Sequence, residues 1–191
     1  MPLWISLLRG VNVGGHHKVS MDALRALYES LGFQGVQTYI NSGNVLFTTA
    51  ARDPERLRQR IEDAFESACG FHSHVILRAP ADLRSVVARN PFAARPAIDA
   101  GRVAVHFLTG ELSAALTQQI LAIHPGPEEL HAAGRELYIY YTNGMARPQL
   151  SLPRLEKTMR MSGTSRNWNT VRKLLALAEK LESAPNRSKS H

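Results

Sequence analysis

The sequence predicts an α+β protein made of two ferredoxin-like (βαββαβ-type) halves, with the C-terminal half extended by helices. Residues 1–90 follow the pattern strand, helix, strand, strand, helix, strand, and the same order returns in outline after residue 101. Glycines and prolines stand where helices should begin or end. Hydrophobic residues form 44% of the 191 residues, enough for a core in one domain or in two small packed domains.

Short apolar runs and capped helices define the first half. Ser20 can cap the first helix and Gly32 can end it, while Pro54 opens the second helix and Gly70 ends it. The sequence Asn-Ser-Gly-Asn at 41–44 has the composition of a tight hairpin turn. We therefore expect strands at 2–8, 36–40, 45–49 and 73–79, and helices at 21–31 and 54–69.

The second half follows a short helix at 82–88 and a stretch rich in proline, alanine and glycine. We expect strands at 102–108, 129–132 and 136–141, and helices at 113–123, 152–161 and 168–181. The predicted organisation is an N-terminal domain at 1–90, a linker at 91–101, a C-terminal domain with terminal helices at 102–182 and a disordered tail at 183–191. This order suggests an internal structural repeat, although no residue-level repeat is visible.

Composition predicts a cytoplasmic protein. A single cysteine, Cys69, cannot form an internal disulfide, which fits a reducing compartment. The N-terminal apolar run is too short for a signal peptide, and no run approaches transmembrane length, so we expect no membrane partner.

Two blocks of the sequence resemble a known family. Residues 7–47, which begin LLRGVNVGG and end YINSGNVLF, are similar to the opening signature of the uncharacterised bacterial family known as domain of unknown function 1697. Residues 163–174, GTSRNWNTVRKL, resemble that family's other signature. The resemblance implies an α+β fold of ferredoxin-like halves and no assigned substrate, so it leaves open whether the protein is an enzyme.

The glycine loop after the first strand is a candidate anion site. Gly10 and Gly15 have the spacing of the two P-loop glycines, but two histidines intervene before Lys18, which excludes nucleotide hydrolysis by that route. Backbone amides of the loop could still meet an anion beside Arg9, although the glycines also serve simply to turn the chain.

Two further polar segments could complete a pocket with this loop. The hairpin turn at 41–44 offers carboxamides and a hydroxyl, and we expect a hydroxyl-rich cap at Thr164 or Ser165 before the last helix. Helix capping and hairpin geometry explain part of this composition without a ligand. The predicted ligand-binding or anion-binding residues are Arg9, Asn12, Gly14, Gly15, Lys18, Asn41, Ser42, Asn44, Arg166, Asn167 and Asn169.

The net charge of +7 is concentrated at the C-terminal end. Residues 151–191 contain nine lysines and arginines and three glutamates, so this segment carries a net charge of +6. Such a balance indicates either a solubilising surface or a nucleic-acid partner. The predicted nucleic-acid-binding residues are Arg154, Lys157, Arg160, Arg166, Arg172 and Lys173.

No residue pattern marks a reaction. His72 and His74 would share one strand face, but no cysteine or carboxylate recurs at metal spacing, so we expect no metal and no cofactor. The leading hypothesis is a phosphate-binding or nucleic-acid-binding protein that uses the basic C-terminal region. The alternatives are an enzyme or sensor for an anionic metabolite at the glycine loop, and a protein-interaction scaffold.

Overall fold

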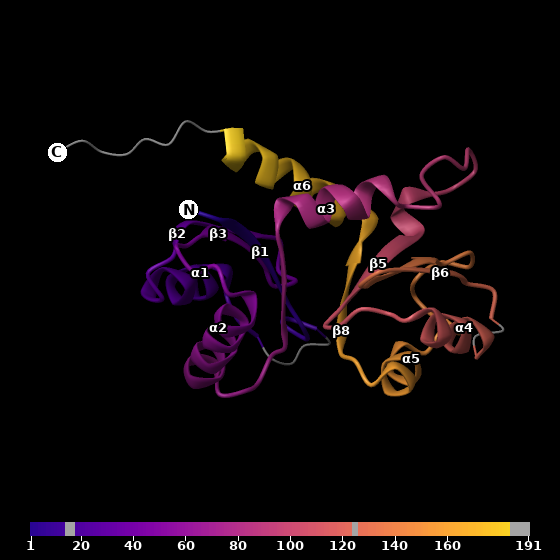
Figure 1. Cartoon of the computed structure of the whole chain (residues 1–191), viewed down its shortest axis with the longest axis horizontal. Helices are drawn as coiled ribbons and strands as arrows, with labels where there is room; N and C mark the ends of the chain where they lie inside the picture. The colour runs from indigo at the N-terminus through magenta and orange to yellow at the C-terminus, as the bar shows by residue number, and fades with distance from the viewer. Residues whose placement is uncertain (14–17, 124–125, 184–191) are drawn as a thin grey trace.

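The computed structural model describes residues 1–13, 18–123 and 126–183. Gly14, Gly15 and residues 184–191 therefore lie outside the described residues. Within these ranges the chain forms two four-stranded antiparallel sheets and six α-helices (Figure 1). None of the described helices is long and apolar enough to cross a membrane.

The first sheet has the strand order β2-β3-β1-β4. Its strands are β1 (Leu3–Leu8), β2 (Gln34–Tyr39), β3 (Asn44–Thr48) and β4 (Val75–Arg78), and its helices are α1 (Met21–Ser30) and α2 (Pro54–Cys69). The predicted caps form: the Ser20 side chain accepts the amide of Ala23, and Gly70 ends α2 in the left-handed conformation. Strand β1 is apolar on both faces because Leu7 enters a central core while Leu8 packs beneath α1 and α2.

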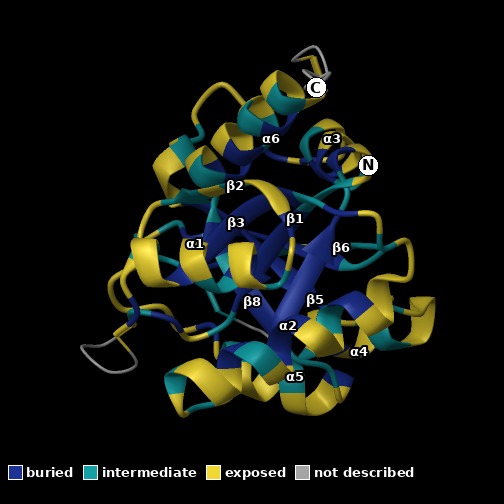
Figure 2. Ribbon diagram, turned by 90° about the vertical axis from the view of Figure 1, so that its left-hand side faces the viewer, coloured by how far each residue is buried: buried dark blue, intermediate teal, exposed yellow. Residues whose placement is uncertain are grey.

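The second sheet has the corresponding order β6-β7-β5-β8. Its strands are β5 (Val103–Leu108), β6 (Glu129–Ala133), β7 (Glu136–Tyr140) and β8 (Gly163–Asn167), and its helices are α4 (Ala114–Ala122) and α5 (Leu152–Met159). Figure 2 shows that the central strands are buried while the outer faces of the helices are exposed; the edge strands β2 and β6 are only partly buried.

Strand β8 corrects the prediction at 164–165, where we expected a helix cap. Thr164 and Ser165 instead lie in an edge strand paired with β5. The sequence Gly-Thr-Ser-Arg-Asn lacks the apolar residues that usually signal a strand. It forms a strand because β5 offers backbone hydrogen-bond partners along its free edge.

Helices α3 (Pro80–Ala88) and α6 (Trp168–Ser183) pack against each other along one side of the molecule (Figure 1). Leu83 of α3 and Leu174 of α6 join the inner faces of both sheets in one central core. Phe92, inside the expected linker, is also buried in this core. The two halves therefore share a core as well as a connection.

The strand registers reveal a repeat that the sequence hides. Ile5 is paired with Arg78, and Val105, one hundred residues later, is paired with Arg166. The main-chain bonds repeat as well, because the amide of residue 8 donates to Gly43 O at 2.8 Å and that of residue 108 to Arg135 O at 2.9 Å. Residues that pair with the same position of the central strand are therefore equivalent in the two halves. The equivalent residues are Arg78 and Arg166, Asn44 and Glu136, Val75 and Gly163, and Ser6 and His106.

Candidate functional site

The glycine loop and the hairpin turn do lie together, and Asn12 joins them. The Asn12 side chain accepts the amide of Val19 at 2.8 Å and donates to the carbonyls of Val19 and Asn41, each at 2.9 Å. Asn12 adopts a φ of 58°, a left-handed conformation that asparagine tolerates. Its carboxamide therefore links Val19 and the turn at Asn41, while Lys18 is exposed.

Arg166 reaches the same place from the second half, but it is buried, with 5% of its surface exposed. Burial, without a carboxylate among its hydrogen-bond partners, lowers the pKa of Arg166 to about 10. Its guanidinium donates to Leu8 O, Ser42 O, Gly43 O, Ser165 O, Asn44 Oδ1 and Thr164 Oγ1. These acceptors engage the guanidinium that we expected to bind an anion. Arg166 therefore links the two halves.

Two further carboxamides of the expected pocket, those of Asn44 and Asn167, also bond within the protein. Asn44 Nδ2 donates to Tyr39 O and to Ser42 Oγ, each at 2.9 Å. At the other end of β8, Asn167 donates to Gly101 O at 2.8 Å and accepts the amide of Asn169 at 2.9 Å, as a helix cap does. The exposed Asn169 is the second residue of α6, beyond the end of the strand opposite Gly163.

Arg9 forms a second link between the halves. It makes a two-pronged ion pair with Glu156 of α5, with N–O distances of 3.0 and 2.7 Å. Glu156 also accepts the amide of Gly163 at 3.0 Å, and His106 Nε2 lies 3.2 Å from its carboxylate. Burial raises the pKa of Glu156, but hydrogen bonds from His106 and Arg9 outweigh burial and hold it below the usual range.

The basic residues of the C-terminal segment divide between two sides of the molecule. Arg154, Lys157 and Arg160 are exposed on or next to α5, whereas Arg172 and Lys173 are exposed on α6. Figures 1 and 2 place α5 and α6 on opposite sides. The predicted nucleic-acid-binding set therefore does not form one surface.

A cleft of about 500 Å³ lies along β4, between the first sheet and the second half. Strand β4 is the edge of its sheet, so the cleft is bordered by an edge strand. The remaining lining comes from α2, from the residue before β4, from the residue after β5, from the β6–β7 turn and from the segment between α5 and β8. The lining residues are Pro54, Glu55, Arg58, His74, Val75, Ile76, Leu77, Arg78, Thr109, Arg135, Arg160 and Ser162.

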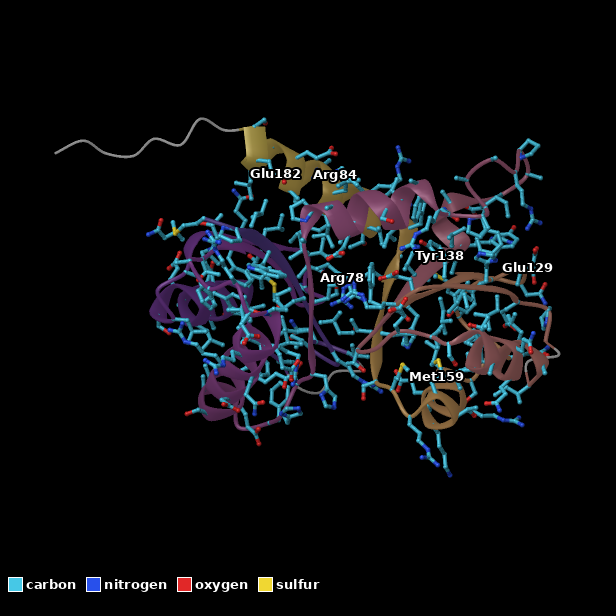
Figure 3. All side chains as sticks on the ribbon, viewed as in Figure 1. Arg78, Arg84, Glu129, Tyr138, Met159 and Glu182 are labelled. Atoms are coloured by element: carbon cyan, nitrogen blue, oxygen red, sulfur yellow. The ribbon has the colours of Figure 1, made fainter. Side chains whose placement is uncertain are left out.

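Four arginines and one carboxylate give the cleft lining a positive excess. Arg78 is buried and donates to Glu136 at 3.0 Å, and Figure 3 places it at the centre of the molecule. Arg58 is held by Glu55 and Glu62, while Arg135 is partly exposed and lies 3.2 Å from Asp82. Arg160 is exposed in a left-handed conformation, with φ 52°.

One group of side chains near the cleft could hold a metal ion. Ligand atoms of Glu62, His72 and His74 all lie within 4.8 Å of one another. Burial lowers the pKa of His74, against the opposing charge of Glu62 and with smaller contributions from His72, Arg9 and Arg58. The sequence led us to expect no metal because Glu62 is on a helix ten residues before His72.

Sequence reasoning missed most of the cleft. Of its arginines only Arg160 was singled out, as a nucleic-acid contact, whereas Arg58 and Arg135 were not. They come from separate elements with no shared spacing, so no motif could have collected them.

Comparisons with known proteins agree with this architecture. A family model described as "Protein of unknown function (DUF1697)" matches residues 1–138. None of the curated proteins matches the chain. The chain is similar in fold to a solved structure, the conserved bacterial protein SP0830 from Streptococcus pneumoniae, with a TM-score of 0.68 and 23% identity over 94% of this chain and 99% of that one.

Proposed function

The chain belongs to the DUF1697 family, whose function is unknown, and we propose that it binds a small phosphate-bearing anion in the cleft along β4. The observation that carries the proposal is that Arg135 and Arg160 lie together on one concave surface, opposite the Arg58 that Glu55 and Glu62 hold in place. Planar guanidinium groups bind phosphate oxygens through paired hydrogen bonds.

The proposal includes a ferredoxin-like fold for each half. The strand orders β2-β3-β1-β4 and β6-β7-β5-β8, each with two helices in the βαββαβ sequence, support it. In this view the cleft exists because two such units are set against each other with one edge strand facing the partner half.

The dimensions and composition of the cleft favour a small ligand. A volume of about 500 Å³ falls within the usual range for small-molecule sites. The apolar side chain of Leu77, which keeps 8% of its surface exposed, could contact the uncharged part of such a molecule. The single, half-buried Cys69 is compatible with the cytoplasmic setting that we propose.

Pyrophosphate and ATP are suitable probes for this site. At matched ionic strength we expect each to raise the melting temperature of the full chain in a saturable way, because a ligand that binds only the folded state stabilises it. The Arg135→Ala/Arg160→Ala variant should lose this response. Arg154→Ala is the matched control, since Arg154 is also exposed on α5 but does not line the cleft. No response of the wild type, or an equal loss in the control, would contradict the proposal.

Nucleic acid is the second candidate ligand, supported by the exposed Arg154, Lys157 and Arg160 beside the cleft. Phosphate contacts predict binding that weakens steeply with salt. Fluorescence anisotropy with a generic single-stranded RNA would then show a smaller salt slope in Arg154→Ala/Lys157→Ala than in Arg172→Ala/Lys173→Ala. Equal slopes in the two variants would remove the α5 surface as the contact.

A further inference from the structure

Glu62, His72 and His74 form a compact group at the boundary between α2 and the segment that leads into β4. His72 Nε2 lies 3.4 Å from His74 Nδ1, and His74 Nδ1 lies 4.0 Å from Glu62 Oε1. Ligands of a tetrahedral Zn²⁺ at their usual bond lengths are separated by roughly 3.4 Å. The histidine pair already has this separation, and a small shift would bring the carboxylate into range.

The carboxylate is held in position by the fold. Glu62 is buried, and its Oε1 accepts the amide of Val75 at 2.8 Å while its Oε2 is bonded by Arg58. An ionised carboxylate oxygen has a second lone pair, so Oε1 can accept the amide and still face a cation. The two imidazoles are nearly half exposed, which leaves the solvent side open for ion entry and for water ligands.

A second carboxylate orients one of the histidines. Glu66 Oε2 lies 3.2 Å from His72 Nδ1, one helical turn beyond Glu62 on α2. With Nδ1 facing this carboxylate, Nε2 is the ring nitrogen turned toward His74. Histidine ligands of metals commonly donate their second ring N–H to a carboxylate in this way.

The neighbouring cations leave the histidine side of the group open. Arg58 is bonded to Glu55 as well as to the far oxygen of Glu62. The main-chain amide of Arg9 donates to His74 O, but its guanidinium is engaged by Glu156. The negative charges of Glu62 and Glu66 are therefore the ones nearest to the two imidazoles.

We propose that Glu62, His72 and His74 bind a divalent transition-metal ion of the Zn²⁺ type, with Glu66 as the positioning residue of His72. Because His74 also lines the cleft, the ion lies at the edge of the proposed anion site. The metal site does not depend on that site, since each can be measured without the other.

Metal binding by the untagged full chain tests the inference directly. Calorimetry with Zn²⁺ should give one more bound ion per chain for the wild type than for His72→Ala/His74→Ala. With Co²⁺ as the probe, the wild type should develop the visible absorption of a low-symmetry, four-coordinate or five-coordinate ion, and the double variant should not. Glu66→Gln should keep the site but weaken it about tenfold or more.

His131→Ala supplies the matched control, because His131 is an exposed histidine on β6, away from this group. This control should bind Zn²⁺ like the wild type. Equal Zn²⁺ stoichiometry and affinity in the wild type and the double variant would overturn the inference, as would the absence of binding to both. The melting temperature without metal should be unchanged in His72→Ala, which separates a lost ligand from a lost fold.

Discussion

Arg78 and Arg166 occupy equivalent positions in the two halves, but their charges are compensated differently. Each arginine lies in the edge strand of its own sheet and donates to the carbonyl at the end of a strand in the other half. Arg78 donates to Leu108 O at 3.0 Å, and Arg166 donates to Leu8 O at 2.8 Å. Arg78 also meets the carboxylate of Glu136. The equivalent partner of Arg166 is the neutral amide of Asn44.

The difference shows two ways of burying a cation. Burial lowers the pKa of Arg78, and the negative charge of Glu136 opposes that effect. Arg166 depends on the dipoles of several carbonyl and side-chain oxygens, which come from the turn at 41–44 and from its own strand. Its interface is therefore sensitive to the geometry of that turn, whereas the Arg78 interface is sensitive to charge.

Removing each arginine should have the largest effect. Arg166→Met leaves several buried acceptors without a donor, and we expect a loss of about 4 kcal/mol in the free energy of unfolding, measured by urea denaturation. Arg78→Met should cost about 3 kcal/mol, because Glu136 keeps Arg89 at 3.4 Å but loses its buried partner.

A second substitution at the partner sharpens this comparison. Adding Glu136→Gln to Arg78→Met should recover part of the loss, since it removes an unpaired buried charge. Adding Asn44→Ser to Arg166→Met should recover nothing, because the carbonyls remain unbonded and Asn44 no longer donates to Tyr39 O. The same response in both halves would show that the carboxylate is not what distinguishes them.

Val75 and Gly163 also occupy equivalent positions. We expect a substitution at Gly163 to change the free energy of unfolding by an intermediate amount. A Cβ at Gly163 would lie 2.2 Å from His106 Nε2, whereas the first half has the small Ser6 in place of His106. Gly163→Ala should therefore lower the free energy of unfolding by about 2 kcal/mol. In a His106→Ser background the same substitution should cost clearly less, as measured in a double-mutant cycle. An equal cost in both backgrounds would assign the strain to the carbonyl of Phe107, 2.7 Å away, instead.

Glu62 and Glu156 form the third comparison, with the smallest expected effect. Each accepts the amide of the first residue of the following strand, but Glu62 pairs with Arg58 of its own helix and Glu156 with Arg9 of the other half. We expect Glu156→Gln to cost about 1 kcal/mol at neutral pH.

The lowered pKa of Glu156 predicts how its contribution to the free energy of unfolding changes with pH. Since the pKa of Glu156 is lower in the folded protein, its stabilising contribution is present above the ordinary glutamate pKa and is lost as the pH falls through the folded value. Urea denaturation from neutral to acidic pH should show the wild type and Glu156→Gln converging in acid. A difference that is independent of pH would contradict the role of this ion pair.

Local signals in the sequence determined most helices and strands. Ser20 caps the helix that it was expected to precede, because a side-chain oxygen next to a helical pattern needs no distant partner to act as a cap. Asn12 contacts the hairpin turn through Asn41 O, because both segments follow strands of the same small sheet. The family and the α+β class could also be predicted from the sequence.

Only the tertiary structure decided what these elements do. Arg166 and Asn44 have the composition of a ligand site, but 122 residues separate them along the chain and their bond is buried between the halves. Strand β8 and the cleft likewise depend on pairing partners contributed by distant segments. Whether a polar side chain meets a ligand or another part of the chain depends on which surfaces become buried, and that is set by packing over the whole molecule rather than by neighbouring residues.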